Sequence, residues 1–315
     1  MRSSAPEGEH LFMKAFSSGG ILTAFAAVSF GIAHVIGPLT YGAEGNNVFT
    51  LLLLNNLFTL PLVMLVMFIR RIPFRCDKKA LFPLLAIGVF GTAGTSLCLN
   101  MSFVLTGVGI GTMLHMIYVI LAAVCDSLLL RKRIRLPLIS ALVLVLLGVV
   151  FMAVNDIGTD RSLGGILLSL LSGALYAFYL LSISHTAARN EDPLRVLFYT
   201  MLAAAAVFLA YTTQTGTLAV FTMTKKAWLL NIACAFFNNV LGFFLTQLGI
   251  RKIGASKAAI LGALEPVSSV ILGCIFLQES LSCFKLIGCA CIISGILSQP
   301  VSELFQRRPH KQIKG

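Results

Sequence analysis

Charged residues are scarce in this chain of 315 residues: they make up 11% of it, and only 12 residues are Asp or Glu. Soluble domains carry about 25% charged residues. The hydrophobic share here is 57%, and the mean hydropathy is +0.92. No polar stretch is long enough to form a separate water-soluble domain. The composition therefore excludes a soluble globular protein and predicts a polytopic membrane protein.

Motifs of catalysis and of ATP-driven transport are also missing. The sequence contains no GxSxG, no HExxH and no GxxxxGK[ST], and its apolar runs hold no basic pair that would clamp a phosphate. An intramembrane enzyme is therefore disfavoured and is kept only as the non-transport alternative. Any uphill transport has to draw on an ion gradient, such as protons, or on exchange with a counter-substrate.

The eight cysteines lie mostly inside apolar runs and form no CxxC pair. Neither a metal site nor a disulfide framework is indicated, and no cofactor is expected.

Long apolar runs are what the chain does contain. Ten of them are long enough to cross about 30 Å of hydrocarbon as helices, and their continuity excludes the alternating pattern of barrel strands. We predict an all-α membrane protein with spans at residues 20–41, 48–68, 80–105, 107–130, 136–154, 164–184, 194–213, 227–250, 255–277 and 281–298.

Basic residues concentrate on one side of these spans. If the N-terminus is cytoplasmic, all but four of the 24 Lys and Arg fall on the inner side, and the four exceptions are Arg161, Lys225, Lys226 and Lys285. The positive-inside rule then predicts a multi-pass protein of the cell (inner) membrane with both termini in the cytoplasm. The net charge of +12 is a signal of topology rather than of nucleic-acid binding, because the basic residues are spread over several connections.

The chain also repeats itself. GGIL at 19–22 recurs at 164–167, and Gly148 of LLGVVFM corresponds to Gly295 of ISGIL. Each half holds five predicted spans, so the second half should enter the membrane in the opposite orientation. Such inverted repeats are typical of secondary transporters, which bind substrate at the repeat interface near the bilayer midplane. We predict a cytoplasmic tail, a first repeat, an external linker, a second repeat and a basic cytoplasmic tail at residues 1–18, 19–154, 155–163, 164–299 and 300–315.

Two segments resemble the EamA family of the drug/metabolite transporter superfamily. One is RKIGASKAAILGALEPVSSVILGCIFLQESLSCFKLIGCACIISGIL, residues 251–297, and the other is TGVGIGTMLHMIYVILAAV, residues 106–124, in the first half. The resemblance covers residues 19–297. It implies ten helices in two inverted five-helix repeats, a central cavity, and transport of a small organic metabolite, often an amino acid or a related compound and commonly by export. Multidrug or organic-cation efflux and flipping of a lipid-linked carrier are the alternatives within the superfamily.

The fourth span departs from the family pattern. Val119 stands where a proline usually follows the tyrosine, here Tyr118, and Lys132 stands where the following loop usually has a glutamate. We therefore expect the first half to bend less than in its relatives.

A glutamate directly before a proline interrupts the apolar run LGALEPVSSVILG, residues 261–273. Pro266 removes a backbone donor at a cost of about 3 kcal/mol in an ordinary helix interior, which predicts a kink. Glu265 at the centre of a span costs about 2.5–3.5 kcal/mol on insertion scales, so it has to face protein or water. It either binds an ammonium group or carries protons, or it is a neutral, hydrogen-bonded glutamate that ties two helices together.

Other polar side chains inside the spans are candidates for the substrate pathway, and packing with a satisfied hydrogen bond is the alternative for each of them. They are His34, His115, Tyr118, Tyr176, Tyr179 and Asn239. Asp126, near the basic segment RKRIR, is expected to form an anchoring ion pair. Asn55 and Asn56 stand where relatives frequently have a basic residue, and their role is open.

Overall fold

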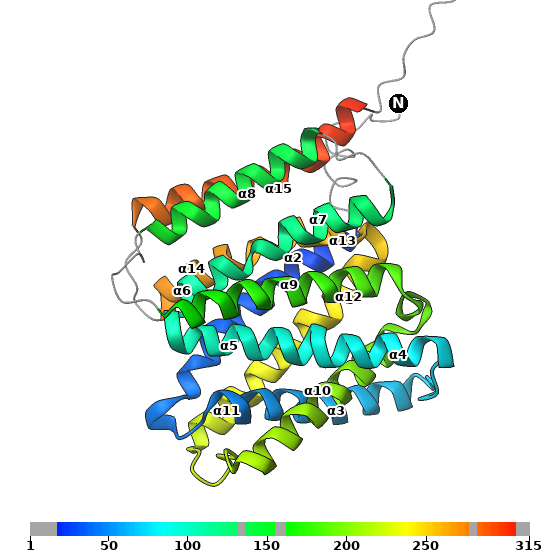
Figure 1. Cartoon of the computed structure of the whole chain (residues 1–315), viewed down its shortest axis with the longest axis vertical. Helices are drawn as coiled ribbons and strands as arrows, with labels where there is room; N and C mark the ends of the chain where they lie inside the picture. The colour runs from blue at the N-terminus through cyan, green and yellow to red at the C-terminus, as the bar shows by residue number, and fades with distance from the viewer. Residues whose placement is uncertain (1–17, 132–135, 155–161, 277–281, 307–315) are drawn as a thin grey trace, which may run out of the picture.

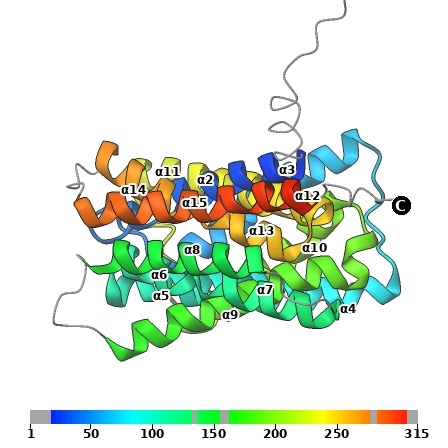
Figure 2. The same ribbon diagram turned by 90° about the horizontal axis from the view of Figure 1, so that it is seen from above.

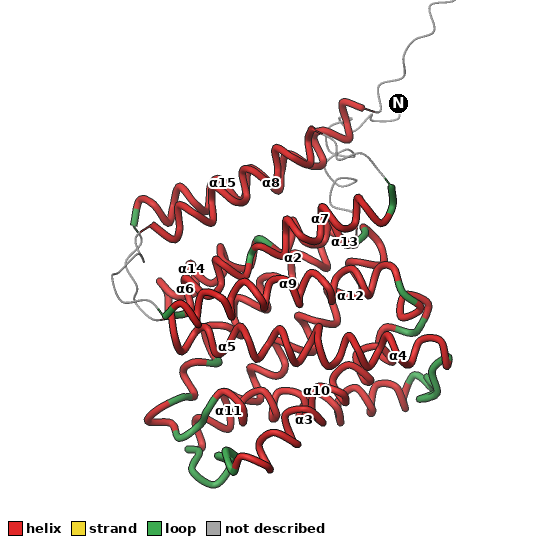
Figure 3. Tube along the Cα trace, in the orientation of Figure 1, coloured by secondary structure: helices red, strands yellow, loops and turns green. Residues whose placement is uncertain are grey.

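The computed structural model describes residues 18–131, 136–154, 162–276 and 282–306. Within these ranges the protein consists of helices joined by loops, with one isolated bridge between Tyr41 and Asn46 (Figure 3). The prediction of an all-α protein is confirmed for the described residues.

The helices of the first half include two short 3₁₀ turns, η1 and η2, and a π-helical segment, η3. They are α2 (Ser18–Ile36), η1 (Pro38–Thr40), η2 (Gly42–Glu44), α3 (Val48–Ile69), α4 (Lys78–Ala86), η3 (Ile87–Gly94), α5 (Thr95–Thr106), α6 (Val108–His115), α7 (Ile117–Leu129) and α8 (Leu136–Val154).

The second half includes one 3₁₀ turn, η4, and a second π-helical segment, η5. Its helices are α9 (Leu163–His185), η4 (Ala187–Asn190), α10 (Pro193–Thr215), α11 (Lys225–Ala235), η5 (Phe236–Phe243), α12 (Phe244–Ile253), α13 (Ala255–Gly262), α14 (Leu264–Phe276) and α15 (Cys283–Gln306).

Eight helical segments among the described residues are long and apolar enough to cross a membrane: Ser18–Thr40, Val48–Ile69, Lys78–Thr106, Val108–Leu129, Leu163–His185, Pro193–Thr215, Lys225–Ile253 and Ala255–Leu272. They match eight of the ten predicted spans. The other two predicted spans coincide with α8 and α15, whose apolar stretches are shorter, at Leu138–Met152 and Cys283–Ser298. The chain is therefore a multi-pass membrane protein.

The order of elements in the first half is repeated in the second. A helix with a π-helical segment of 8 residues in its middle (α4–η3–α5 or α11–η5–α12) ends at a glycine, Gly107 or Gly254, and these glycines are 147 positions apart. Their φ angles of 83° and 84° lie in a region that side chains with a Cβ avoid. A helix of 8 residues and one of 13 residues follow in both halves.

Corresponding connections of the two halves lie at opposite ends of the helix bundle, as the α2–α3 and α9–α10 connections show in Figure 1. We call the end with residues 70–77, 186–192 and 254 the basic end. The end with residues 37–47 and 216–224 is called the opposite end.

The fourth span is interrupted although it has no proline after Tyr118. Helices α6 and α7 meet at Met116, where ψ is −7°, and α13 and α14 meet at the corresponding Ala263, where ψ is −4°. The second interruption lies three residues before Pro266, whereas the first is packed against α9, where a Cβ on Gly173 would clash with the carbonyl of His115. The fourth span is therefore interrupted without a proline, and packing against α9 accompanies this break as Pro266 accompanies the one in the second half.

The two halves interlock. Helix α2 packs against α12, α13 and α14 of the second half, and α9 packs against α5, α6, α7 and η3 of the first. Helix α8 lies along α15, and the two views of the ribbon agree on this pair (Figures 1 and 2). The interface between the halves is consequently formed by α2 and α9 with the interrupted helices, together with the α3–α10 and α8–α15 pairs.

Candidate functional site

A small, partly open pocket lies where the two halves meet. Its volume is about 40 Å³, which leaves room for only a few water molecules. Aromatic rings of Phe30, Tyr176 and Phe243 form part of its wall. We call it the central cavity and define it by its polar residues His34, Asn55, Asn100, His115, Asn238 and Glu265.

The central cavity contains an acid–histidine pair. Oε1 of Glu265 on α14 lies 3.0 Å from Nδ1 of His34 on α2, and the two side chains are 3% and 11% exposed. The approach is at ion-pair distance, but neither atom has a hydrogen bond of good geometry within the described structure. A buried charged or polar atom without a full set of partners is costly. The pair therefore has bonding capacity to spare, which a proton or a substrate group in the cavity would use.

A second histidine is held in a defined tautomer. Nδ1 of His115 lies 2.8 Å from Oγ of Ser172, and that hydroxyl donates to the carbonyl of Ser169 at 2.7 Å. Because the hydroxyl proton of Ser172 is already used, His115 has to be the donor and carries its proton on Nδ1. This leaves Nε2 of His115 as an acceptor at the cavity.

Two tyrosines lie behind the acid. Tyr118 and Tyr176 line a second space of about 10 Å³, which also reaches Glu265. The ring centroids of the two tyrosines are 4.7 Å apart in an edge-to-face arrangement. Tyr118 is fully buried, and its hydroxyl has no hydrogen-bond partner among the described residues. The structure thus brings Tyr118, which is the repeat equivalent of Glu265, to the same centre.

Tyr179 lies on α9, one turn closer to the basic end than Tyr176. It belongs to a layer of aromatic rings between the central cavity and that end. It stacks on Tyr176 with centroids 5.7 Å apart, and its hydroxyl donates to the carbonyl of Phe243 at 3.4 Å. Its side chain is fully buried and does not line the central cavity. This layer closes the cavity toward the basic end.

Asn239 is placed between helices rather than at the central cavity. Its side chain is 1% exposed and donates to the carbonyl of Asn55 at 2.8 Å and to the hydroxyl of Thr59 at 3.0 Å, which ties η5 to α3. The adjacent Asn238 lines the cavity instead. Substitutions of Asn238 and Asn239 can therefore be compared directly, because one amide joins helices and the other faces the cavity.

Replacing these two asparagines should separate stability from transport. We expect Asn239→Ala to lower the free energy of unfolding by about 1–2 kcal/mol, since it removes two hydrogen bonds between membrane helices. Asn238→Ala removes the hydrogen bond that Asn238 donates to Oδ1 of Asn239 at 3.1 Å within the same segment, so it should lower the thermal midpoint less than Asn239→Ala and should weaken substrate affinity. Thermal unfolding in detergent and transport measured over a range of substrate concentrations check both results. The reverse assignment of the two effects would contradict the placement of these side chains.

Sequence reasoning missed Asn100, Asn238 and Phe30 as cavity residues. Asn100 had a usable signal, because it is a lone amide inside the predicted span 80–105. Asn238 and Asn239 are adjacent, and composition alone does not tell which amide faces a cavity. Phe30 has no signal of its own, since phenylalanine is common throughout the spans.

Metal ligation has no support in the described part of the chain, which contains no group of three or more His, Cys, Asp or Glu side chains able to hold an ion. Asp126 pairs with His185 of α9, with Oδ1 and Nε2 2.6 Å apart. Most of the basic segment expected to pair with Asp126, residues 132–135, lies outside the described residues.

Comparisons with known proteins agree with this architecture. The model of the EamA-like transporter family matches residues 17–154 and 163–298. The uncharacterized transporter YcbK of Bacillus subtilis (strain 168) is 28% identical over 296 residues, which cover 87% of this chain and 89% of that protein. An uncharacterized transporter of Archaeoglobus fulgidus is 27% identical over 171 residues, 54% of this chain and 59% of that protein.

A solved structure described only as the crystal structure of a protein has the same fold. Its TM-score is 0.77 at 17% identity, and the match covers 92% of this chain and 99% of that one. The two segments matched by the family model correspond to the two structural halves, so the chain belongs to the EamA-like transporter family.

Proposed function

We propose that the protein is a secondary transporter that moves a small organic metabolite across the cell membrane by alternating access to the central cavity. The observation that carries this proposal is the buried pair of Glu265 and His34, which joins helices of the two repeated halves. An acid inside a membrane bundle is expensive and is therefore a mark of a transport site. The absence of a nucleotide-binding motif in the sequence favours an ion gradient or exchange as the energy source.

The proposed topology has ten membrane helices in two inverted repeats. In this arrangement α8 and α15 are the fifth helix of each repeat, and their packing along one another supports their pairing in the membrane. The basic end faces the cytoplasm, together with both termini, because it carries the dense groups of Lys and Arg. The opposite end then faces the outside.

The substrate proposed for this site is an amino acid or a related amino compound, moved outward. Glu265 supplies a carboxylate for an ammonium group, and the faces of Phe30, Tyr176 and Phe243 favour a cation near them. The amides of Asn55, Asn100 and Asn238 offer donors for a carboxylate and acceptors for an amine. A space of about 40 Å³ does not hold such a molecule, so the site has to widen to admit substrate.

Transport into sealed vesicles tests the proposal. Purified protein in liposomes should accelerate counterflow of at least one labelled amino acid or related amine several-fold over protein-free vesicles. The panel also contains nucleoside derivatives, organic cations without a carboxylate, and a lipid-linked sugar. Ser294→Ala, a change at an exposed site of α15, is the control and should transport like the parent. Movement of organic cations alone would establish efflux instead, movement of the lipid-linked sugar alone would establish a flippase, and no movement of any solute would contradict a transporter of this class.

A further inference from the structure

At the opposite end, Glu44 ties the α2–α3 connection to the start of α11. Its Oε1 accepts from Nζ of Lys226 at 2.8 Å, its Oε2 accepts from the hydroxyl of Thr224, and its carbonyl accepts from the backbone N–H of Thr224 at 3.1 Å. The hydrogen bond from Lys226, with that from Thr224, lowers the pKa of the Glu44 carboxyl, which is therefore ionised at neutral pH. The side chain of Lys226 is 67% exposed, so water and salt weaken this cluster.

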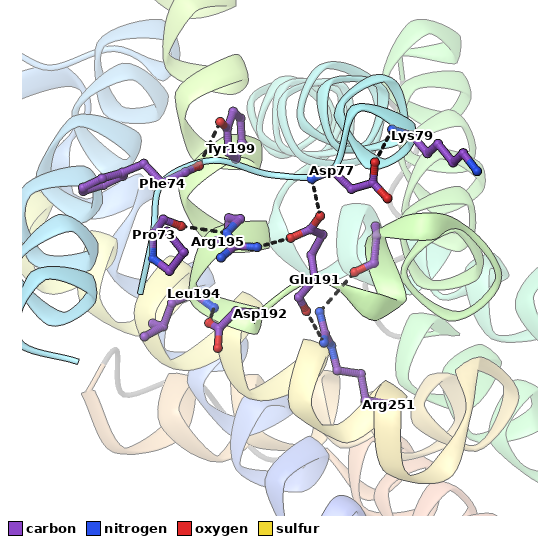
Figure 4. Close-up of polar contacts among 11 residues, drawn as sticks. Pro73, Phe74, Asp77, Lys79, Glu191, Asp192, Leu194, Arg195, Tyr199 and Arg251 are labelled. Carbon is purple, nitrogen blue, oxygen red and sulfur yellow. Dashed lines mark hydrogen bonds and ion pairs between the residues drawn. The ribbon is translucent and has the colours of Figure 1, made fainter. Parts of the chain in front are cut away.

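At the basic end, Glu191 ties the α9–α10 connection to the start of α4 (Figure 4). Its Oε1 accepts from the backbone N–H of Asp77 at 2.7 Å, and its Oε2 pairs with the guanidinium of Arg195. The guanidinium of Arg251 on α12 donates to the carbonyl of Glu191 at 2.5 Å and to that of Ala188 at 3.2 Å. Glu191 is only 6% exposed, so its interactions are screened much less than those of Glu44.

The two clusters are related by the repeat. The offset of 147 positions that relates the two halves takes Glu44 to Glu191 and Asp77 to Thr224. Asp77 and Thr224 are the N-cap residues of α4 and α11. In each cluster a glutamate from the first connection of one half therefore binds the capped start of the third span of the other half, once at each end of the bundle.

The Glu44 cluster holds the connection that lies next to the central cavity at the opposite end, where we expect one exit of the cavity. Tyr41, in the same connection, donates its hydroxyl to Oδ1 of Asn100, a cavity residue, at 3.2 Å. Asn46 reaches toward Asn231 of α11, with Nδ2 and Oδ1 3.5 Å apart. Opening this exit requires the α2–α3 connection to move away from α11.

The Glu191 cluster stands at the other exit. Phe243, Gln247 and Arg251 follow one another at intervals of four residues, from the wall of the central cavity to the carbonyl of Glu191. Gln247 is fully buried and lies next to the hydroxyl of Tyr179, and neither of its amide atoms has a hydrogen bond of good geometry among the described residues. A buried amide that is bonded this incompletely is costly, so water entering this path would stabilise it.

The ways from the central cavity to the two ends of the bundle are not closed equally tightly. Gln247 is the repeat equivalent of Asn100, since the same offset of 147 relates them. Asn100 is half-buried and lines the cavity, whereas Gln247 is sealed from it. The path toward the basic end is thus closed more tightly, on the same side as the buried cluster.

We propose that Glu44 and Glu191 are paired latches of the alternating-access cycle. Each latch is a set of contacts that holds one end of the bundle closed, and the buried Glu191 latch is the stronger. The substrate-free protein then rests with the basic end closed and the opposite end ready to open. This inference rests on the proposed transport function and adds to it the residues that set which side the empty site faces. Breaking a buried ion pair shifts a two-state equilibrium more than breaking an exposed one.

Cysteine reporters at the equivalent positions 100 and 247 test the latches. N-ethylmaleimide labelling of Asn100→Cys and Gln247→Cys is followed in liposomes, and peptide mass spectrometry separates each reporter from the eight native cysteines. In the parent we expect Asn100→Cys to react at least about tenfold faster. Glu191→Gln should raise the rate at Gln247→Cys by about tenfold and lower that at Asn100→Cys, because the population moves toward opening at the basic end.

The control variants are chosen from the same two connections. Asn190→Ala changes the exposed residue directly before Glu191 and leaves the contacts of Glu191 in place, so both reporter rates should stay within about twofold of the parent. Glu44→Gln should not raise the rate at Gln247→Cys, because it shifts the population toward opening at the opposite end. If Glu191→Gln does not fold, Arg195→Gln, which removes the cation from the same carboxylate, should shift the two rates in the same direction by a smaller factor.

Labelling needs no substrate, so it is independent of the vesicle assay. An unchanged rate at Gln247→Cys in folded Glu191→Gln, or an equal change in Asn190→Ala, would overturn the latches in a protein that still transports. The expected labelling pattern in a protein that moves no solute would support the latches and overturn the proposed transport function.

Discussion

Replacing Glu265 with glutamine should abolish gradient-driven accumulation and the pH dependence of transport. Glutamine keeps the size and hydrogen-bonding capacity of the side chain but neither ionises nor releases a proton. If Glu265 carries protons, exchange of substrate across the membrane should continue, because exchange needs only alternating access with substrate bound. We expect accumulation to fall at least about tenfold, because a buried acid that costs so much free energy in a membrane helix is there for function.

Counterflow and pH-jump uptake in the same liposomes distinguish the two roles of Glu265. If it binds a substrate ammonium, counterflow fails as well, and cationic substrates suffer more than neutral ones. Ser268→Ala is the matched control, because that hydroxyl lies one turn away and bonds only to the carbonyl of Glu265 on its own helix at 2.8 Å. A folded Glu265→Gln protein with parental accumulation and an unchanged pH profile would leave Glu265 as a tie between α14 and α2.

Replacing Gly31 with leucine should strongly reduce the amount of folded protein. Gly31 of α2 lies against α14, where a Cβ would overlap the hydroxyl of Ser268 and come within 3.0 Å of the carbonyl of Glu265. Close approach of small residues is a main source of helix association in membranes, and overpacking costs about 1–3 kcal/mol or more. The forced separation would also pull Glu265 away from His34, so the folded remainder should not transport.

Detergent-solubilised yield and thermal midpoint measure this effect. Gly164→Leu is the control, since a Cβ at Gly164 would meet only the hydroxyl of Ser162 at 3.4 Å, an ordinary contact. That variant should keep the parental midpoint. A Gly31→Leu protein as stable as Gly164→Leu would show that α2 and α14 do not pack this closely.

Several polar residues of the cavity are recognisable from the amino-acid sequence alone, and for one reason. A titratable group in an apolar run is so costly that its presence is informative by itself, as with His34, His115 and Glu265. The same local signal does not say what such a group touches. His34 and Glu265 lie far apart in the chain, and their contact follows from the packing of α2 on α14.

The interruption at Met116 and the role of Asn239 show a second limit of prediction from the sequence. Proline is a local reason for a break, and its absence at position 119 predicted a straighter helix, yet packing against α9 accompanies a break there as well. Asn239 was predicted at the pathway because it is a polar side chain inside a span, but the two hydrogen bonds that it donates go to the neighbouring helix α3. The sequence of one helix does not show which neighbouring helices its side chains contact.

The sequence by itself determined that the chain crosses the membrane many times, that it is built from two related halves, and which side chains are expensive within the spans. These properties follow from hydrophobicity, charge and spacing along the chain, which act locally. Only the tertiary structure decided that His34 meets Glu265, that Asn238 rather than Asn239 faces the cavity, and that Glu44 and Glu191 hold equivalent connections at opposite ends. Each of those facts depends on how helices of the two halves pack against one another, and no pattern within a single helix specifies that packing.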